Sequence, residues 1–398
     1  MAAAESTRAQ VRLGTDDLSS GPWVFARQVA EVGAAVEPGD LVEVLDASDR
    51  FVGHGLYNPA SDIRLRMLSR GRRKALDRPR EFLLARLKSA DRLRRRLLRL
   101  EAVGDTYRVA HAEGDDLPGL IVDRLAGHLV CEHHALGFWR LREEVAWALG
   151  QLYPQLEVVH RVPRSAARAE GFDPAVLEQQ ERAEYPAIEI REHGLRYPVR
   201  PAFGHKTGWF CDQRENRVLV AGFAGGREVL DLCCNAGGFA LQAKRAGARR
   251  VIGVDLDEVV LERAAEAARL NELDVEFHHI DAFHYLRGAR ETDRRFDVVV
   301  LDPHKLVAAK RDLEAGLRKY SDFNTLALEC VRRGGLLATF SCSGPVSESA
   351  FIGMVFQAAR RAGREIRLLA QLGAGPDHPQ RPEFQRSRYL KGALLAVD

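Results

Sequence analysis

The chain has 398 residues, of which 46% are hydrophobic, and this length favours two or three domains. No apolar stretch approaches the roughly 20 residues that span a bilayer, the first residues lack a basic head followed by an apolar stretch, and six cysteines are scattered without Cys-x-x-Cys spacing. These features argue against a membrane protein, a disulfide framework and a structural zinc site, and we expect a cytoplasmic protein. The net charge of +3 is nearly neutral but unevenly distributed.

Residues 1–75 read as short strands joined by turns. Apolar runs at 41–45 and 51–57 flank the polar connector 46–50, which is typical of a hairpin in a small β-barrel. Three stretches, 21–25, 38–42 and 55–59, the last followed by Ile63-Arg64-Leu65-Arg66, resemble a PUA domain. That resemblance implies an RNA-binding module, with Arg64 and Arg66 as candidate RNA contacts.

Residues 76–196 are expected to form a connecting α+β domain with a basic helix. From Arg64 to Arg108 there are 16 Lys and Arg against 5 Asp and Glu, a local balance of 16 − 5 = +11. Such clustering indicates a phosphate-binding surface, and Arg94, Arg95 and Arg96 lie at its centre. The alternative is the solvated face of a helix over 90–100, where leucines recur at helical spacing.

The segment 113–124 in the same region combines aspartates with Gly and Pro. Asp115, Asp116 and Asp123 have the composition of a metal site, but a turn leading into a strand explains them more simply. We therefore predict a turn here and no metal.

From 197 to 398, strand and helix signals alternate, which predicts a parallel sheet with helices on both faces. Apolar runs at 228–234, 251–255, 275–281, 296–302 and 336–341 are the expected strands. Helices are expected through residue 248, over 258–270 and over 324–332.

A glycine turn follows the first of these strands and indicates a cofactor site. Gly237 and Gly238 let a ligand approach the backbone, and Asp255, about 20 residues on, is placed to accept ribose hydroxyl groups. Both a nicotinamide cofactor and S-adenosylmethionine carry such a ribose. Because the turn lacks the Gly-x-Gly-x-x-Gly pattern that a pyrophosphate requires, S-adenosylmethionine is favoured.

Four carboxylates, each ending one strand, outline one ligand trough. Asp231 is placed to hold the amino-acid end of the cofactor and Asp281 to contact the adenine amino group, although each alone also reads as a strand-end or helix-capping residue. The candidate cofactor residues are Asp231, Asn235, Gly237, Gly238, Phe239, Asp255, Leu256, Asp281, Ala282 and Asp302.

Cys342 ends the apolar run 336–341 in a small polar turn, and Asp302 ends the run 296–301. Neighbouring strands lie roughly 5 Å apart, so both side chains can reach one planar ring if their strands are adjacent. Carbon 5 of a pyrimidine needs activation before it takes a methyl group, and a thiolate that adds at carbon 6 supplies it. Cys342 is therefore the candidate nucleophile, and Asp302 the candidate partner of N3 and the exocyclic amine of cytosine. The alternative for Cys342 is burial as a small apolar side chain.

From residue 203 onward the chain resembles the bacterial 23S rRNA cytosine-5 methyltransferases of the RlmI type. The stretches that carry the resemblance are 206–208, 212–217, 237–240, 302–305, 320–324, 340–344, 377–379 and 389–392. It implies a Rossmann-like methyltransferase domain with a seven-stranded mixed sheet, Cys342 as nucleophile, Lys305 within the catalytic motif, and RNA contacts at Lys206 and Arg214. Ribosomal RNA and, by analogy with relatives, a second copy of the chain are the implied partners.

This chain departs from the family pattern at two places. His304 stands where the family has a second proline, and Cys234-Asn235-Ala236 replaces a Ser-Tyr-Thr turn. Two alternatives remain open: a methyltransferase acting on a base amino group such as guanine N2, which needs no thiol, and a non-catalytic RNA-binding assembly protein that retains the fold.

Overall fold

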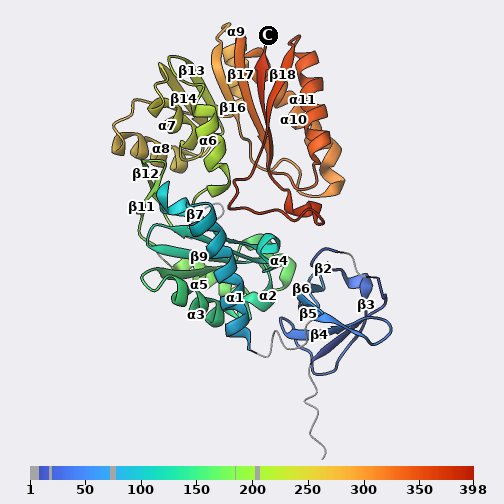
Figure 1. Ribbon diagram of the computed structural model, residues 1–398. Helices are drawn as coiled ribbons and strands as arrows, with labels where there is room; N and C mark the ends of the chain where they lie inside the picture. The colour runs from blue at the N-terminus through green and yellow to red at the C-terminus, as the bar shows by residue number, and fades with distance from the viewer. Residues whose placement is uncertain (1–8, 18–19, 72–77, 184, 202–206) are drawn as a thin grey trace, which may run out of the picture. The chain divides into compact units, whose positions relative to one another are not determined.

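The computed structural model describes residues 9–17, 20–71, 78–183, 185–201 and 207–398 (Figure 1). The chain divides into two compact units. The first comprises 1–188, 200–210 and 376–387, and the second 189–199, 211–375 and 388–398. Each unit is therefore assembled from segments that are distant in sequence. The division into three domains with bounds at 75 and 196 remains a prediction.

The first unit begins with a six-stranded sheet in the order β2-β6-β5-β4-β1-β3. Its strands are β1 (Gln10–Leu13), β2 (Trp23–Val24), β3 (Val29–Val32), β4 (Leu41–Leu45), β5 (Phe51–Tyr57) and β6 (Leu65–Arg70). The predicted strands at 41–45 and 51–57 are confirmed, and they pair as antiparallel neighbours. Val11, Leu13, Val42 and Val44 fill the core of this sheet.

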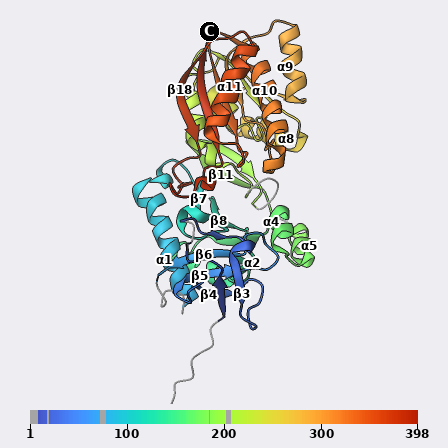
Figure 2. The same cartoon turned by 90° about the vertical axis from the view of Figure 1, so that its right-hand side faces the viewer.

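The rest of the first unit packs helices against a four-stranded sheet, β10-β9-β8-β7. Its strands are β7 (Thr106–His111), β8 (Leu120–Leu125), β9 (His128–His133) and β10 (Glu157–Arg161). The helices are α1 (Pro79–Asp91), α2 (Leu136–Arg140), α3 (Arg142–Leu152), α4 (Arg164–Glu170) and α5 (Pro174–Arg182). The 113–124 segment is a turn into β8, as predicted. A π-helical stretch, Arg92–Leu97, continues α1, and Figure 2 shows the same elements from the side.

The second unit is built on a seven-stranded sheet in the order β15-β14-β13-β16-β17-β19-β18. Its strands are β13 (Glu228–Leu232), β14 (Arg250–Asp255), β15 (Glu276–His279), β16 (Phe296–Leu301), β17 (Val331–Ser341), β18 (Ile366–Gly373) and β19 (Lys391–Val397). Strands β13 to β17 pair in parallel, and β19 pairs antiparallel with both β17 and β18. The predicted mixed sheet of seven strands is confirmed. A hairpin of β11 (Ile188–Glu192) and β12 (Leu195–Val199) precedes it.

Alternating residues of the central strands enter two separate cores. Leu230 and Leu232 of β13 pack with α9 (Ala282–Glu291), α10 (Leu313–Glu329) and α11 (Glu348–Arg361). Val229, which precedes Leu230, packs with α6 (Arg214–Ala221) and α7 (Gly238–Arg245) on the opposite face. Because successive strand side chains point to opposite faces, both faces of the sheet are covered by helices. The predicted two-sided arrangement is confirmed.

One of the predicted helices, 324–332, begins and ends at different residues in the structure. α8 spans Glu258–Leu270 as expected, but the helix expected at 324–332 is α10, which spans Leu313–Glu329. Residues 331–333 instead open β17, because Val331 pairs with Phe296 in the sheet. Cys330 therefore ends a helix rather than lying inside one. None of the described helices is long and apolar enough to cross a membrane.

Candidate active site

In the glycine turn between β13 and α7, every second residue has a left-handed backbone conformation. Cys233 has φ 59°, Asn235 has φ 49° and Gly237, which caps α7, has φ 76°. Asparagine tolerates this conformation better than most side chains. The Asn235 N–H donates to Asp255 Oδ2 (2.8 Å), and the Gly237 N–H donates to the Cys234 carbonyl (2.9 Å). These two hydrogen bonds are donated by main-chain amides, so they do not require the side chains that differ from the family pattern.

Asp231 lies beneath this turn and is fully buried. Its Oδ2 accepts a hydrogen bond from the Ala240 N–H (2.9 Å), while Oδ1 is buried without a hydrogen-bond partner. Burial raises the pKa of this carboxyl well above its ordinary value, and the nearby carboxylates of Asp302 and Asp255 add to the shift. Its direct role is thus to hold the start of α7, and its orphaned oxygen gives the site a preference for positive charge.

The next two strand ends supply a carboxylate each. Asp255 accepts from Asn235 and from the Asp257 N–H (3.0 Å), and Asp281 caps α9 by accepting from the His284 N–H (3.0 Å). Leu256 is 65% exposed and Ile280 37% exposed, and the Ile280 N–H donates to the Asp255 carbonyl (3.0 Å). Exposed apolar side chains beside carboxylates suit an adenosine, whose base offers flat faces and whose ribose offers hydroxyl groups.

Two predicted cofactor residues have buried side chains. Phe239 packs against Phe340 with ring centroids 5.5 Å apart, in the core on the α6 and α7 face. Ala282 belongs to the core on the opposite face. Both remain candidates only through their main-chain groups, because their side chains serve helix packing.

The four predicted carboxylates all contribute to the raised pKa of one thiol, that of Cys233. The pKa of the Cys233 thiol is raised, first by burial and then by the charges of Asp255, Asp302, Asp231 and Asp281. Carboxylates gathered this closely repel one another, so a cationic ligand stabilises the arrangement. The donor set therefore fits a ligand that combines an adenosine with positive charge.

Asp302 and Cys342 follow adjacent parallel strands, as the sequence predicted. Leu301 of β16 pairs with Thr339 of β17, so both side chains emerge at the same sheet edge. The Gln213 amide donates to Asp302 Oδ2 (2.8 Å), and the Asn216 amide donates in turn to Gln213 Oε1 (2.6 Å). Gln213 and Asn216 orient Asp302, and sequence reasoning gave them no role because Asp302 lies 89 positions from Gln213.

The Cys342 turn is held by its neighbour Ser343. The Ser343 hydroxyl accepts from the Val307 N–H (3.0 Å) and is hydrogen-bonded to the Tyr320 hydroxyl (2.9 Å). Val307 lies on the loop that begins at Asp302, so this contact joins the Asp302 loop to the Cys342 turn. Cys342 itself is half-buried, whereas Ser343 on its far side is fully buried. The thiol is thus positioned by a rigid turn and retains exposed surface.

His304 and Lys305 follow Asp302 on the same loop. Both are exposed, whereas Pro303 between Asp302 and His304 is buried. The proline therefore anchors the loop, and the substitution to His304 falls on the exposed part. Lys305 lies close enough to Lys391 to lower the pKa of that amine.

Comparisons with known proteins identify the domains and the family of this chain. Residues 18–70 match a PUA-like domain, and residues 229–323 match a methyltransferase domain. The ribosomal RNA large subunit methyltransferase I of Tolumonas auensis is 36% identical over 94% of this chain and 94% of its own length. The protein of the same name from Shewanella frigidimarina is 35% identical over 94% of this chain and 95% of its own.

The chain belongs to the ribosomal RNA large subunit methyltransferase I family. Two solved structures share its fold. SMU.776, described as a methyltransferase complexed with SAH, matches with a TM-score of 0.81 at 18% identity over 98% of this chain and 100% of that chain. A structure from Streptococcus mutans, described as SAM-dependent, matches with a TM-score of 0.79 over the same shares. The methyltransferase match implies S-adenosylmethionine, whose sulfonium and ammonium groups fit the carboxylates around Cys233.

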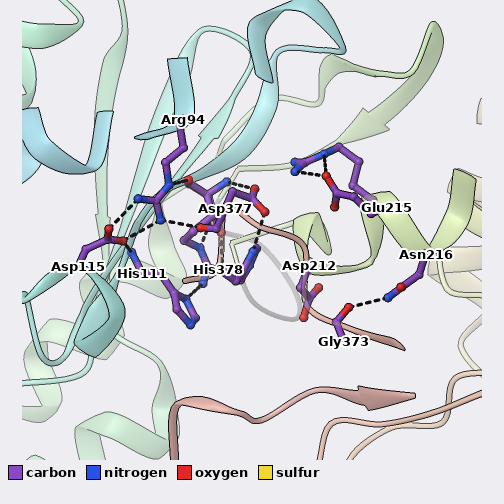
Figure 3. A network of polar contacts seen from close by, with 12 residues as sticks. Arg94, His111, Asp115, Asp212, Glu215, Asn216, Gly373, Asp377 and His378 are labelled. Carbon is purple, nitrogen blue, oxygen red and sulfur yellow. Dashed lines mark hydrogen bonds and ion pairs between the residues drawn. The ribbon is translucent and has the colours of Figure 1, made fainter. Parts of the chain in front are cut away.

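Three arginines predicted to contact RNA are buried in this family member. Arg94 is fully buried and forms a paired ion contact with Asp115, with both nitrogen–oxygen distances 2.7 Å (Figure 3). Arg66 pairs with Glu170 (2.8 Å), and Arg214, 1% exposed, pairs with Glu215 (2.8 Å). Their guanidinium groups offer no surface to a phosphate, so we withdraw them as RNA contacts.

The remaining predicted RNA contacts differ in exposure. Arg95 and Arg96 are exposed, and Arg64 is half-buried. Lys206 lies outside the described residues. Arg95 already pairs with Glu101 (3.1 Å) and lies over the Tyr153 ring. Of the predicted set, Arg96 is therefore best placed for a phosphate.

An exposed basic stripe runs along the end of α1 and the π-helical stretch after it. It consists of Lys88, Arg92, Arg96 and Arg99, all of them exposed. Lys88, Arg92 and Arg96 are spaced four residues apart on one side of the helical segment, and Arg99 follows that segment in a left-handed conformation (φ 51°). Sequence reasoning singled out the run of arginines but not this stripe, because the spacing alone does not say which face is buried.

Proposed function

We propose that this protein transfers a methyl group from S-adenosylmethionine to carbon 5 of a cytosine in large-subunit ribosomal RNA. The observation that carries the proposal is the placement of Cys342 and Asp302 after adjacent parallel strands, beside the carboxylates of Asp231, Asp255 and Asp281. The names of the relatives support ribosomal RNA as the substrate. We take that RNA to be the 23S molecule, and the cell compartment to be the cytoplasm.

The chemistry assigns a separate task to each group. When bound, S-adenosylmethionine supplies an electrophilic methyl group, and Asp231, Asp255, Asp281 and the turn at Gly237 would hold it. The Cys342 thiolate forms a bond to carbon 6, and the electron pair of the carbon 5–carbon 6 double bond moves to carbon 5. After methylation the carbon 5 proton leaves to a base, the double bond re-forms, and the bond between sulfur and carbon 6 breaks to return the thiolate.

Asp302 serves the base in addition to the cofactor. Its carboxyl group is placed by Gln213 and contacts N3 and the exocyclic amine, where charge develops as the sulfur adds. Lys305, exposed on the same loop, is proposed to complete the catalytic motif near the RNA. A methyltransferase acting on a base amino group needs no thiol, so the part played by Cys342 separates the two chemistries.

Mapping methylated positions in ribosomal RNA from cells that lack the protein tests this function. We expect one cytosine of 23S rRNA to lose its carbon 5 methyl group, and the wild-type gene to restore it. The Cys342→Ala variant should restore none, whereas Cys330→Ala, a matched change of a buried thiol, should restore it fully. Loss of a guanine N2 methyl group instead, or restoration by Cys342→Ala, would overturn the proposal.

We also propose a homodimer. Strand β18 is an edge strand of the large sheet and leaves Leu368 45% and Leu369 51% exposed. Phe356 of α11 is 56% exposed in the same unit. Apolar residues at an open edge favour association. Sedimentation equilibrium of the full chain tests this, and a monomer at micromolar concentration would contradict it.

A further inference from the structure

Lys391 is a buried lysine beside the Cys342 turn. Its side chain is 4% exposed, and its Nζ donates to the Ser343 carbonyl (2.6 Å) and to the Tyr389 carbonyl (2.8 Å). The first residue of β19 thus reaches the main chain immediately after the proposed nucleophile. An ammonium group has three N–H donors, and these two carbonyls take two of them.

The charge of Cys342 is one of those that affect the pKa of the Lys391 amine. Burial lowers the pKa of Lys391 to about 8; the Cys342 and Glu348 charges raise it, and the Lys305 charge lowers it. Burial raises the pKa of Tyr320, which holds Ser343, and the Cys342 charge adds to this increase. Because Nζ bonds to the carbonyl of the residue next to Cys342, Lys391 is the buried cation of this turn.

We propose that Lys391 is the positioning residue that holds Cys342 as a thiolate. When the pair carries one proton, that proton resides on Nζ, which gives an ammonium next to a thiolate rather than an amine next to a thiol. No net charge is gained or lost in this transfer from sulfur to nitrogen. The ammonium also fixes the turn through Ser343, so the nucleophile is both charged and aimed. The inference rests on the proposed role of Cys342 as nucleophile.

A purely structural role explains the position less well. A neutral amide donor would satisfy the two carbonyls without the cost of burying a positive charge. A buried cation is favoured where an anion forms beside it, and thiolates are stabilised next to lysine in this way. Lys305 is exposed on the opposite loop, and Glu348 is exposed at the start of α11, so both are more strongly screened by water.

The pH dependence of Cys342 alkylation by iodoacetamide tests the inference. The full chain without RNA or cofactor is labelled between pH 5 and pH 10, and the Cys342 peptide is quantified by mass spectrometry. In the folded wild type we expect half-maximal alkylation at least about one pH unit below that of the urea-unfolded chain. Lys391→Gln, which keeps an N–H donor without the charge, should remove this difference. Lys391→Arg should largely retain it.

Lys310→Gln, which changes an exposed lysine at the end of the Asp302 loop, is the matched control and should leave the alkylation midpoint unchanged. Equal midpoints in the folded and unfolded wild type would overturn the inference, and this comparison decides it even where Lys391→Gln does not fold. A folded Lys391→Gln with the wild-type midpoint would also overturn it. Because the readout needs no RNA, a midpoint shift without cytosine methylation would refute only the proposed function.

Discussion

At the scale of one residue, the buried carboxyl group of Asp231 lowers the stability of the fold at high pH and favours a cationic ligand. Its carboxyl group is buried, has one orphaned oxygen, and lies among other carboxylates. Its folded pKa is raised above the unfolded value, so the folded state binds the proton more tightly. The stability that this provides is present at low pH and is lost as pH rises from about 4 through the folded pKa. Above that range the buried charge destabilises the fold.

Asp231→Asn should therefore stabilise the protein while weakening cofactor binding. The amide oxygen can still accept from the Ala240 N–H, and the buried charge is gone. We expect the free energy of unfolding to rise by about 1–3 kcal/mol at pH 8 and by less at pH 5. S-adenosylmethionine should bind about tenfold more weakly. Urea unfolding and calorimetry measure the two effects.

Asp274→Asn, an exposed change in the same unit, is the control and should alter neither quantity. A less stable Asp231→Asn variant at pH 8 would mean that the carboxylate is needed by the fold rather than by the ligand.

At the scale of one element, the exposed basic stripe at the end of α1 and the buried Arg94 beside it are expected to have different roles. The stripe should affect RNA binding, and Arg94 should affect stability. Changing Arg92, Arg96 and Arg99 together to Gln should weaken RNA binding at low salt and flatten its salt dependence. Each lost phosphate contact lowers the slope of log K against log salt by roughly 0.7–0.9. Filter binding of ribosomal RNA fragments over a salt series measures this.

Arg164→Gln with Arg182→Gln, exposed arginines of α4 and α5, is the matched control. An unchanged salt slope in the triple variant would mean that the stripe is an ordinary solvated helix face and does not bind phosphate. Arg94→Gln is expected to differ in kind, lowering stability through Asp115 rather than changing the slope.

Strand ends were predictable from the sequence because each is a short apolar run that stops at a polar residue. Asp255 ends β14, and Asp302 and Cys342 directly follow β16 and β17, as the apolar runs predicted, whereas Asp231 lies inside β13. The buried face of a helix was less predictable. Arg94 is buried because it pairs with Asp115 and donates to the Asp377 carbonyl (2.6 Å), and Asp377 is distant in sequence. Periodicity alone does not contain that contact.

Lys391 and Gln213 were missed for a related reason. The sequence places Lys391 at the start of an apolar run near the end of the chain, but only the antiparallel pairing of β19 with β17 brings it level with Ser341. Gln213 contacts Asp302 across 89 positions of sequence. Positioning residues of this kind follow from topology and register, whereas nucleophiles and glycine turns have local signatures.

At the scale of the whole molecule, the first unit depends on buried histidines that stay neutral. Burial lowers the pKa of His111 and His133 well below its ordinary value, and lowers that of His160 to about 4. Nearby charges add to the shift, among them His378 for His111 and Arg142 for His160. His133 and His160 are themselves hydrogen-bonded through their ring nitrogens (2.9 Å).

This unit should lose stability in mild acid. A histidine with a lowered folded pKa binds fewer protons folded than unfolded, so its contribution is present above about pH 6.5 and lost as pH falls below it. We expect a loss of about 1.4 kcal/mol for each of the three at pH 5.5. Hydrogen exchange of the β8 and β9 amides measures this in the first unit alone. Protection that is constant from pH 8 to pH 5.5 would contradict it.

The most direct test of the central claim is covalent trapping on ribosomal RNA that contains 5-fluorocytosine. Fluorine at carbon 5 cannot leave as a proton does, so an adduct between sulfur and carbon 6 persists after methylation. With S-adenosylmethionine present, we predict a protein–RNA band that survives denaturing electrophoresis, with the RNA joined at Cys342 and no band from Cys342→Ala. A band of equal strength from Cys342→Ala, or carbon 5 methylation of unmodified RNA by that variant, would contradict the account.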